Sequence, residues 1–314
     1  MRQPKLIIKT AILALTLFSL VLSSTLVAQE AKPAGRTVEL RMIVTGSDNK
    51  SVDKIQKEDV RVIDDKTEQT VLSVERDDRP IDLVLAIDSS GSVRSLFLAV
   101  LESARVIVAN RRPEDEILLE RFISSDKIES MQVFTSDGKA LLAGIDKYYI
   151  EKGQSAVIDA LYVAAGAFAK FNKTSRDRRK VVVIITDGED RNSFYKQEQL
   201  LNYLHQTDVQ VFALGLVTEL DKEAGLIRLS PRDKAEKFLK TVTSETGGRV
   251  FFPRNKTELL DSLQQLIADL RGQFRITYEP SKEKKGFRKV EVKLASPNGE
   301  KRNAIVPRGY ESKS

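Results

Sequence analysis

The stretch LVLAIDSSGS, residues 83–92, joins an almost unbroken apolar run to a short polar turn. Helical periodicity follows over residues 96–109, so we predict a strand, a turn and a helix in that order. The turn offers one carboxylate and two hydroxyls, from Asp88, Ser90 and Ser92. Such hard oxygen ligands suit an octahedral cation such as Mg²⁺ or Mn²⁺, whereas the plainer interpretation is helix N-capping by Ser or Asp.

The middle of the chain repeats this alternation of apolar runs and helical segments. Further apolar runs lie at 117–123, 181–185 and 209–217. Such runs are typical of a parallel sheet that helices cover on both faces. We therefore predict the α/β class, with a doubly wound, mainly parallel sheet flanked by helices over residues 80–272. The last helix is expected at 257–271, capped by Asn255 or Thr257, with one apolar stripe of Leu259, Leu260, Leu263, Leu266, Ile267 and Leu270.

Two later loops also place side-chain oxygens near strand ends. Asp187 follows the apolar run 181–185, and Ser155 precedes a helix predicted at 156–171. In open α/β sheets, ligands bind at the carboxyl ends of the strands, near the point where strand order reverses. Taken singly, Ser155 is also explained as a helix cap and Asp187 as a turn former. We expect Asp159 either behind such a site or on the helix surface.

Together the three loops resemble the metal-ion-dependent adhesion site of the von Willebrand factor type A domain, and the resemblance covers nearly all of residues 81–272. That site takes a DxSxS turn, a threonine from a second loop and an aspartate from a third. Asp88, Ser90 and Ser92 match the first element, and Asp187 matches the third. Ser155 stands where the family usually has threonine, which keeps the hydroxyl but loses the methyl group that restricts its rotamer. The resemblance implies a Rossmann-like fold and is strongest with exported bacterial members.

The chemistry of these residues also points to binding. Two aspartates balance the charge of a divalent cation, and neutral hydroxyls leave it electrophilic, so an Asp or Glu of a partner protein can complete its coordination. The resemblance implies the same device, used in adhesion or complex assembly. We expect Mg²⁺ or Mn²⁺, with Ca²⁺ as a third candidate, in a binding protein that is not an enzyme. The alternative is a structural or assembly protein whose cation only stabilises the loops.

The two ends of the chain are predicted to form strands. In the first end, residues 36–79, apolar side chains alternate from Val38 to Val44. The second end, residues 273–311, contains expected strands at 274–278, 290–294 and 304–306, the last two joined by a turn at 297–299. Because neither end can bury enough apolar surface alone, we expect both to pair in one small β-sandwich, with the α/β domain inserted between them.

The first 28 residues have the features of a secretory signal peptide. Arg2, Lys5 and Lys9 precede an apolar run from Ala11 to Val27, and cleavage is expected after Ala28. The length of the run leaves an uncleaved membrane anchor as an alternative. Either outcome predicts an exported protein, periplasmic, at the cell surface or secreted. The chain contains no cysteine, which excludes disulfides and thiolate metal ligands.

Several classes of function find no support in the sequence. Without the three basic residues of the signal segment, the number of Lys and Arg residues falls from 51 to 48, against 45 Asp and Glu residues, so the charges nearly balance. No aromatic residues accompany the basic clusters as a stacking surface for bases. We therefore expect no nucleic-acid partner. Neither a GxxxxGK[ST] nor a GxGxxG motif occurs, so no nucleotide is expected. The single histidine, His205, lies in a predicted amphipathic helix and is expected to face solvent, which argues against a Ser-His-Asp triad.

Overall fold

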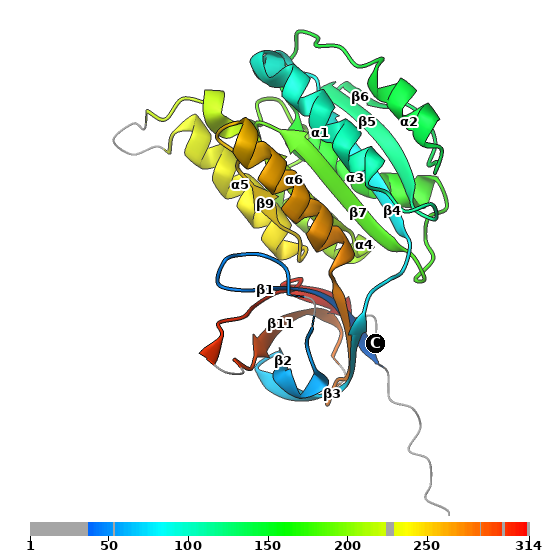
Figure 1. Ribbon diagram of the computed structural model, residues 1–314, viewed down its shortest axis with the longest axis vertical. Helices are drawn as coiled ribbons and strands as arrows, with labels where there is room; N and C mark the ends of the chain where they lie inside the picture. The colour runs from blue at the N-terminus through cyan, green and yellow to red at the C-terminus, as the bar shows by residue number, and fades with distance from the viewer. Residues whose placement is uncertain (1–36, 53, 224–228, 283, 297–298, 313–314) are drawn as a thin grey trace, which may run out of the picture. The chain divides into compact units, whose positions relative to one another are not determined.

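The computed structural model describes residues 37–52, 54–223, 229–282, 284–296 and 299–312. The predicted signal peptide at 1–28, with its alternative as an anchor, lies outside these ranges. Within them, no helix is both long and apolar enough to span a membrane. The described chain is built around two β-sheets, one mainly parallel and one antiparallel (Figure 1).

A six-stranded sheet forms the centre of the α/β part. Its strand order is β6-β5-β4-β7-β8-β9, and only β6 runs antiparallel to its neighbour. Because the chain passes from β4 to β5 and then returns to the other side of β4 for β7, strand order reverses beside β4. The predicted doubly wound sheet is confirmed. Its strands span Ile81–Asp88 (β4), Glu116–Ser124 (β5), Lys127–Ser130 (β6), Arg179–Thr186 (β7), Gln210–Gly215 (β8) and Val250–Phe251 (β9).

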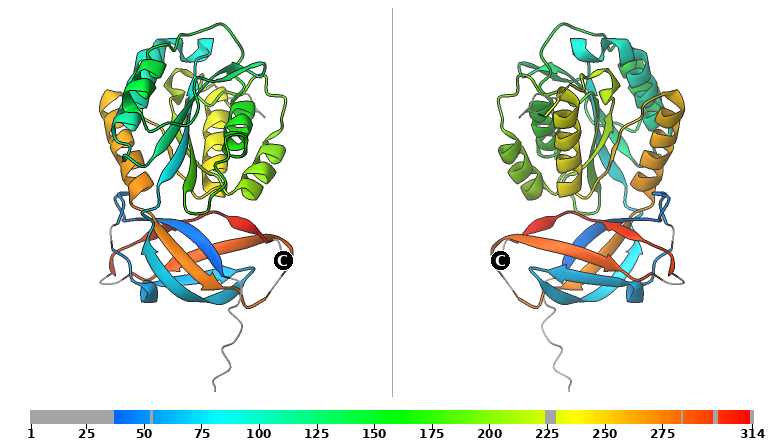
Figure 2. Two further views of the ribbon diagram at one scale, coloured as in Figure 1. Left: turned by 90° about the vertical axis from the view of Figure 1, so that its right-hand side faces the viewer. Right: turned by 90° about the vertical axis from the view of Figure 1, so that its left-hand side faces the viewer.

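Helices cover both faces of this sheet, which explains its uninterrupted apolar strands. Alternate residues of β4 serve the two faces: Leu83 and Leu85 pack with α1, α2 and α6, and Val84 packs with α3, α4 and α5. Figure 2 shows the sheet between these two helical layers. The helices span Phe97–Ala109 (α1), Gly138–Ile145 (α2), Val157–Lys170 (α3), Gln197–Thr207 (α4), Pro231–Glu245 (α5) and Lys256–Arg271 (α6).

The last helix, α6, differs from its prediction at one residue of the apolar stripe. Its predicted cap is present, because the Asn255 side-chain oxygen accepts a hydrogen bond from the Glu258 amide (3.0 Å). Leu259 and Leu263 are buried as expected, but Leu260 is 46% exposed. A step of one residue turns a side chain by about 100° around a helix, which carries Leu260 away from the buried face.

The two chain ends combine in one antiparallel sheet of seven strands, in the order β12-β1-β10-β3-β2-β11-β13. Strand β10, from the second end, lies between β1 and β3 from the first. The predicted small β-sandwich is therefore one antiparallel sheet, which curls over an apolar core of its own (Figure 2). The strands span Val38–Thr45 (β1), Val60–Asp64 (β2), Thr67–Arg76 (β3), Phe274–Glu279 (β10), Gly286–Leu294 (β11), Asn303–Ile305 (β12) and Gly309–Ser312 (β13).

The connections near the carboxyl terminus differ from a simple hairpin. Strands β11 and β12, which the predicted turn at 297–299 connects, do not pair with each other. Instead β12 pairs with the end of β1, and β11 pairs with β13, a strand that the sequence did not indicate. The chain therefore crosses the small sheet before it returns to β11.

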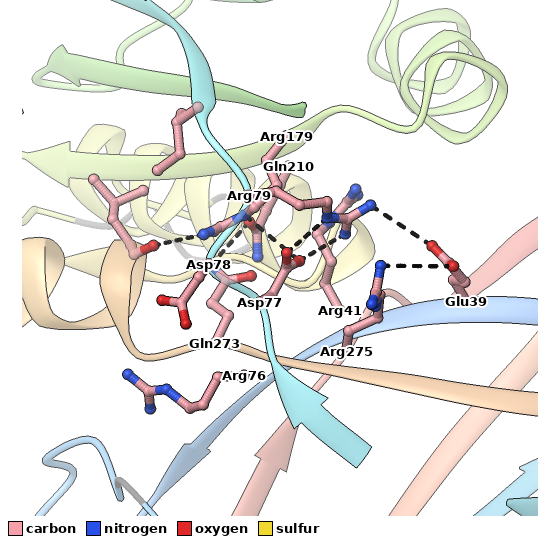
Figure 3. Close-up of polar contacts among 12 residues, drawn as sticks. Glu39, Arg41, Arg76, Asp77, Asp78, Arg79, Arg179, Gln210, Gln273 and Arg275 are labelled. Carbon is pink, nitrogen blue, oxygen red and sulfur yellow. Dashed lines mark hydrogen bonds and ion pairs between the residues drawn. The ribbon is translucent and has the colours of Figure 1, made fainter. Parts of the chain in front are cut away.

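A buried ion-pair cluster of Asp77, Arg79 and Arg179 lies where the two sheets meet (Figure 3). Asp77, in the link between β3 and β4, accepts two hydrogen bonds from Arg79 (2.6 and 2.7 Å). Arg179, the first residue of β7, is 2% exposed and lies 3.8 Å from the same carboxylate. It also donates to the Leu270 carbonyl near the end of α6 (2.8 Å). This cluster ties the inserted domain to the strands on both sides of it.

Candidate metal centre

The predicted site residues lie at the carboxyl ends of β4 and β7, beside the point where strand order reverses. Asp88 is the last residue of β4, and Asp187 directly follows β7. The two strands are parallel neighbours, so their ends meet at one edge of the sheet. The fold therefore brings together two carboxylates that are far apart in sequence.

The first loop forms a compact turn around Asp88. One Asp88 oxygen accepts a hydrogen bond from the Ser90 amide (3.0 Å), and the Ser90 and Ser92 hydroxyls lie 2.9 Å apart. A 3₁₀ segment at Gly91–Leu96 follows, and α1 begins only at Phe97. Ser90 flanks this segment, but its side chain makes no capping hydrogen bond. The hydroxyls are turned to each other and not to the helix, which argues against the capping interpretation.

The second loop brings the Ser155 hydroxyl to the same aspartate. Ser155 is buried and donates to the second Asp88 oxygen (3.2 Å). The position before α3 is occupied by Ala156, and α3 has no side-chain cap. Ser155 therefore does not cap the helix that follows it. The Ser155 hydroxyl contacts Asp88, and Ser155 occupies the position at which the adhesion site of the family usually has its threonine.

Thr186, the last residue of β7, belongs to the same group, although the sequence analysis did not single it out. Its hydroxyl donates to Asp88 (2.7 Å) and accepts from the Gly188 amide (2.9 Å). Gly188 has φ +76°, a backbone conformation that a residue with a side chain rarely adopts. The sequence did contain a signal for Thr186, because it is a hydroxyl residue next to Asp187 at the end of a predicted strand.

Asp187 is buried and only partly satisfied. One of its oxygens accepts from the Glu189 amide (2.9 Å), and the other has no hydrogen-bond partner among the described residues. Burial and the charge of Asp88 raise the pKa of Asp187 to about 6. Burial also raises the pKa of Asp88, against the hydrogen bonds from Thr186, Ser90 and Ser155. Two adjacent buried carboxylates with raised pKa values form an arrangement that a divalent cation would stabilise.

The donor set fits a hard divalent cation. It consists of the carboxylates of Asp88 and Asp187 and the hydroxyls of Ser90, Ser92 and Ser155, all oxygen ligands. Nowhere in the described ranges do three His, Cys, Asp or Glu side chains converge on one point, so binding here would depend on the hydroxyls. The unpartnered Asp187 oxygen supplies the vacant acceptor that such a cation requires.

Asp159 positions the third loop. It is buried, which excludes the expected helix-surface location, and accepts from the amides of Phe194 (2.7 Å) and Tyr195 (2.9 Å) and from the Ser125 hydroxyl (2.5 Å). The same loop donates its Arg191 amide to the Ser155 carbonyl (2.8 Å). Asp159 therefore holds the loop that follows Asp187 against the loop that carries Ser155.

His205 does not face solvent as predicted. Its side chain is 14% exposed, with Nε2 3.2 Å from a Glu245 oxygen and the ring 4.6 Å from that of Phe287. These contacts place it between α4, the end of α5 and β11, and not at the carboxyl ends of β4 and β7. An amphipathic helix predicts which face is buried, but not that a residue at its last turn will meet a distant strand.

The chain is similar to several solved structures at low sequence identity. The conserved hypothetical protein BatB from Bacteroides thetaiotaomicron is 16% identical, over 60% of this chain and 98% of its own, with a TM-score of 0.46. An aerotolerance-related membrane protein from Bacteroides fragilis is 18% identical, over 60% and 98%, with a TM-score of 0.45. A von Willebrand factor type A protein from Catenulispora acidiphila is 11% identical, over 83% and 76%, with a TM-score of 0.48.

These likenesses are too distant to assign a function, and no curated protein matches the chain. The family model for the von Willebrand factor type A domain, in contrast, matches residues 82–268. The match covers more than half of the chain and takes in β4, β7 and all six helices up to Ala268. It agrees with the strand order and with the loops that surround Asp88. The chain belongs to the von Willebrand factor type A domain family.

Proposed function

We propose that this chain is a metal-ion-dependent protein-binding module that acts outside the cytoplasm. Its family suggests a protein-interaction module. The observation that carries the finer proposal is the buried pair Asp88 and Asp187 at the switch point of the sheet. Hydroxyl groups donate to Asp88, and one oxygen of Asp187 has no hydrogen-bond partner among the described residues. The predicted export signal at 1–28 supports the location.

The donor set also suggests what the partner provides. Asp88 and Asp187 together carry the two negative charges that balance a divalent cation, and the serine hydroxyls add none. A bound cation, Mg²⁺ or Mn²⁺ with Ca²⁺ as a third candidate, would supply an electrophilic centre at the surface. The residues of this chain would fix the position of the cation, and an Asp or Glu carboxylate of the partner would complete its coordination. We propose binding and not catalysis, since the single histidine, His205, lies elsewhere.

The first experiment is calorimetric titration of Mg²⁺, Mn²⁺ and Ca²⁺ into residues 29–314. Saturable binding is expected for the wild type and should be lost in the double variant Asp88→Ala/Asp187→Ala. The matched control is Asp261→Ala, which removes an exposed carboxylate of α6 and should leave the titration unchanged. Equal binding by the wild type and the double variant would overturn the assignment of the site.

A second experiment separates this proposal from a structural role for the cation. A random library of seven-residue displayed peptides is selected on the chain in Mg²⁺ and, in parallel, in EDTA. Peptides enriched only in Mg²⁺ should contain Asp or Glu and should not bind Asp88→Ala. If EDTA lowers the melting temperature but both selections enrich the same peptides, the cation only ties the loops together, and the structural alternative is correct.

A further inference from the structure

Phe194 is a large apolar residue on the surface of the loop between β7 and α4, and it is 77% exposed. This loop begins at Asp187, and its Arg191 and Asn192 amides donate to the Ser155 carbonyl (2.8 and 3.2 Å). Two residues span at most about 7 Å of chain, so Phe194 lies on the rim of the candidate metal centre. Because single exposed apolar residues are common on proteins, the way in which Phe194 is held decides its meaning.

Both the backbone and the ring of Phe194 are held in place. Its amide donates to the buried Asp159 (2.7 Å). Its ring packs edge-on against that of Tyr195, with centroids 5.3 Å apart and an angle of 88° between the planes. The Tyr195 ring in turn stacks on Tyr162 of α3 (3.8 Å), which stacks on Tyr203 of α4 (4.4 Å). Phe194 is thus an exposed ring in a fixed position, and it loses little conformational entropy when a partner covers it.

The three loops that build the metal centre also carry unpaired positive charge. Each has an exposed basic side chain that forms no ion pair with the described residues: Arg94, Lys152 and Lys196. The acidic side chains beside them, in contrast, are already engaged. Glu151 and Glu189 form ion pairs, and Asp190 accepts a hydrogen bond from an amide at the start of α3. The rim of the metal centre therefore complements a partner of negative charge.

We propose that the partner presents an acidic segment with a large apolar side chain that packs on Phe194. This inference rests on the proposed function, because it describes the partner of the same metal centre. One carboxylate of the segment completes the coordination of the cation, and further carboxylates pair with the unpaired basic side chains of the rim. Ordered aromatic residues that become buried often carry much of the binding energy, whereas charges at the rim mainly affect the association rate.

The peptide selection in Mg²⁺, run in parallel on the wild type and on Phe194→Ala, tests the apolar contact. Peptides enriched on the wild type should contain a large apolar residue at a fixed spacing from Asp or Glu. Those enriched on Phe194→Ala should keep the acidic residue and lose the apolar one. A wild-type peptide, synthesised and labelled, should bind Phe194→Ala at least tenfold more weakly by fluorescence anisotropy. The matched control Leu72→Ala removes an exposed apolar side chain of β3 and should bind normally.

Two further variants test the fixed ring and the charges. Tyr162→Leu keeps Phe194 but removes the ring on which Tyr195 stacks, so it should weaken the same peptide by a smaller factor. The triple variant Arg94→Gln/Lys152→Gln/Lys196→Gln should slow association more at low than at high NaCl concentration, because salt screens exposed charges. The matched control Lys170→Gln changes an exposed lysine at the carboxyl end of α3 and should associate as the wild type does.

Calorimetric titration of Mg²⁺ into the same variants separates this inference from the metal site. Phe194→Ala should bind Mg²⁺ as the wild type does. Equal peptide affinity in Phe194→Ala and the wild type, or enriched peptides without an apolar residue, would overturn the contact with Phe194 and leave the metal site standing. A selection that enriches no acidic peptide, although Mg²⁺ binds saturably, would overturn the acidic partner. No Mg²⁺ binding by the wild type would overturn the proposed function, and this inference with it.

Discussion

Asp88 and Asp187 show at the scale of single residues how a candidate binding site can lower the stability of the chain that carries it. Both carboxylates are buried, and no ion pair joins either to a basic side chain in the described residues. Burying a charge without a partner costs free energy, and the raised pKa values of both groups record that cost. The metal-free chain should therefore become more stable when one of these charges is removed.

We expect Asp187→Asn to stabilise the metal-free chain at pH 7 by on the order of 1 to 3 kcal/mol. The folded pKa of about 6 lies above the unfolded value, so wild-type stability falls as pH rises from about 4 to about 6 and stays low above that window. The Asp187→Asn variant does not lose stability in this pH range, so its higher free energy of unfolding relative to the wild type should disappear near pH 4. Urea unfolding in EDTA across this range measures the difference.

Saturating Mg²⁺ provides the control for that prediction. The proposed site binds a cation in the folded wild type and not in the variant, so Mg²⁺ should reverse their order of stability at pH 7. A variant less stable than the wild type in EDTA at pH 7 would show that Asp187 makes a favourable contact instead of carrying an unpaired charge.

At the scale of elements, one side chain of α3 makes several of the contacts that hold the loop between β7 and α4. Asp159 accepts from the amides of Phe194 and Tyr195, and both hydrogen bonds involve a charged acceptor. We expect Asp159→Ala to cost about 2 to 4 kcal/mol and to speed hydrogen exchange at these two amides. Exchange should be unaltered in β4. The same exchange rates in variant and wild type would mean that other contacts hold the loop, such as the stacking of Tyr195 on Tyr162, whose ring centroids are 3.8 Å apart.

The strands of the α/β part could be predicted because each is buried on both faces. In β4 and β7 every residue but one is buried, so the apolar runs are nearly continuous. In β1 the alternation of apolar residues correctly predicted a strand, but burial does not follow the same alternation. Met42 faces the small core and Ile43 faces the core of the α/β part, so successive residues are both buried. Such double coverage depends on residues that are distant in the sequence, which local periodicity does not reveal.

The site was predictable to the extent that its residues follow strands. Asp88 and Asp187 stand at strand ends, where the fold class alone implies a meeting point. Thr186 was not singled out although it also ends a strand, and Asp159 was left between two locations because it lies inside a helix. Their roles are hydrogen bonds to other loops, which local periodicity does not encode.

At the scale of the whole molecule, the buried cluster at the junction joins the two sheets. Burial alone would raise the pKa of Asp77, but hydrogen bonds from Arg79 and the charge of Arg179 hold it below its ordinary value. Burial lowers the pKa of Arg179 to about 9, with Asp77 opposing the shift. The cluster therefore favours the charged form of Asp77. Burial disfavours the charged form of Arg179, which makes one close hydrogen bond within the described residues, to the Leu270 carbonyl.

This asymmetry predicts unequal effects of removing the two charges. Asp77→Asn leaves the buried Arg179 without a counterion and should cost about 3 to 5 kcal/mol. Arg179→Met removes a cation that is already disfavoured, and Asp77 keeps its two hydrogen bonds to Arg79, so the cost should be roughly 1 kcal/mol or less. Urea unfolding at pH 7, followed by circular dichroism and tyrosine fluorescence, measures both losses.

The double variant tests whether the loss in Asp77→Asn comes from the stranded arginine. If it does, adding Arg179→Met to Asp77→Asn should recover more than half of the lost stability, because no unpaired buried cation remains. The pH dependence offers a second check. The folded pKa of Arg179 lies below its unfolded value, so the wild type should gain stability relative to Arg179→Met as pH rises above about 9. Additive losses without this gain would mean that shape and packing, and not charge, join the two sheets.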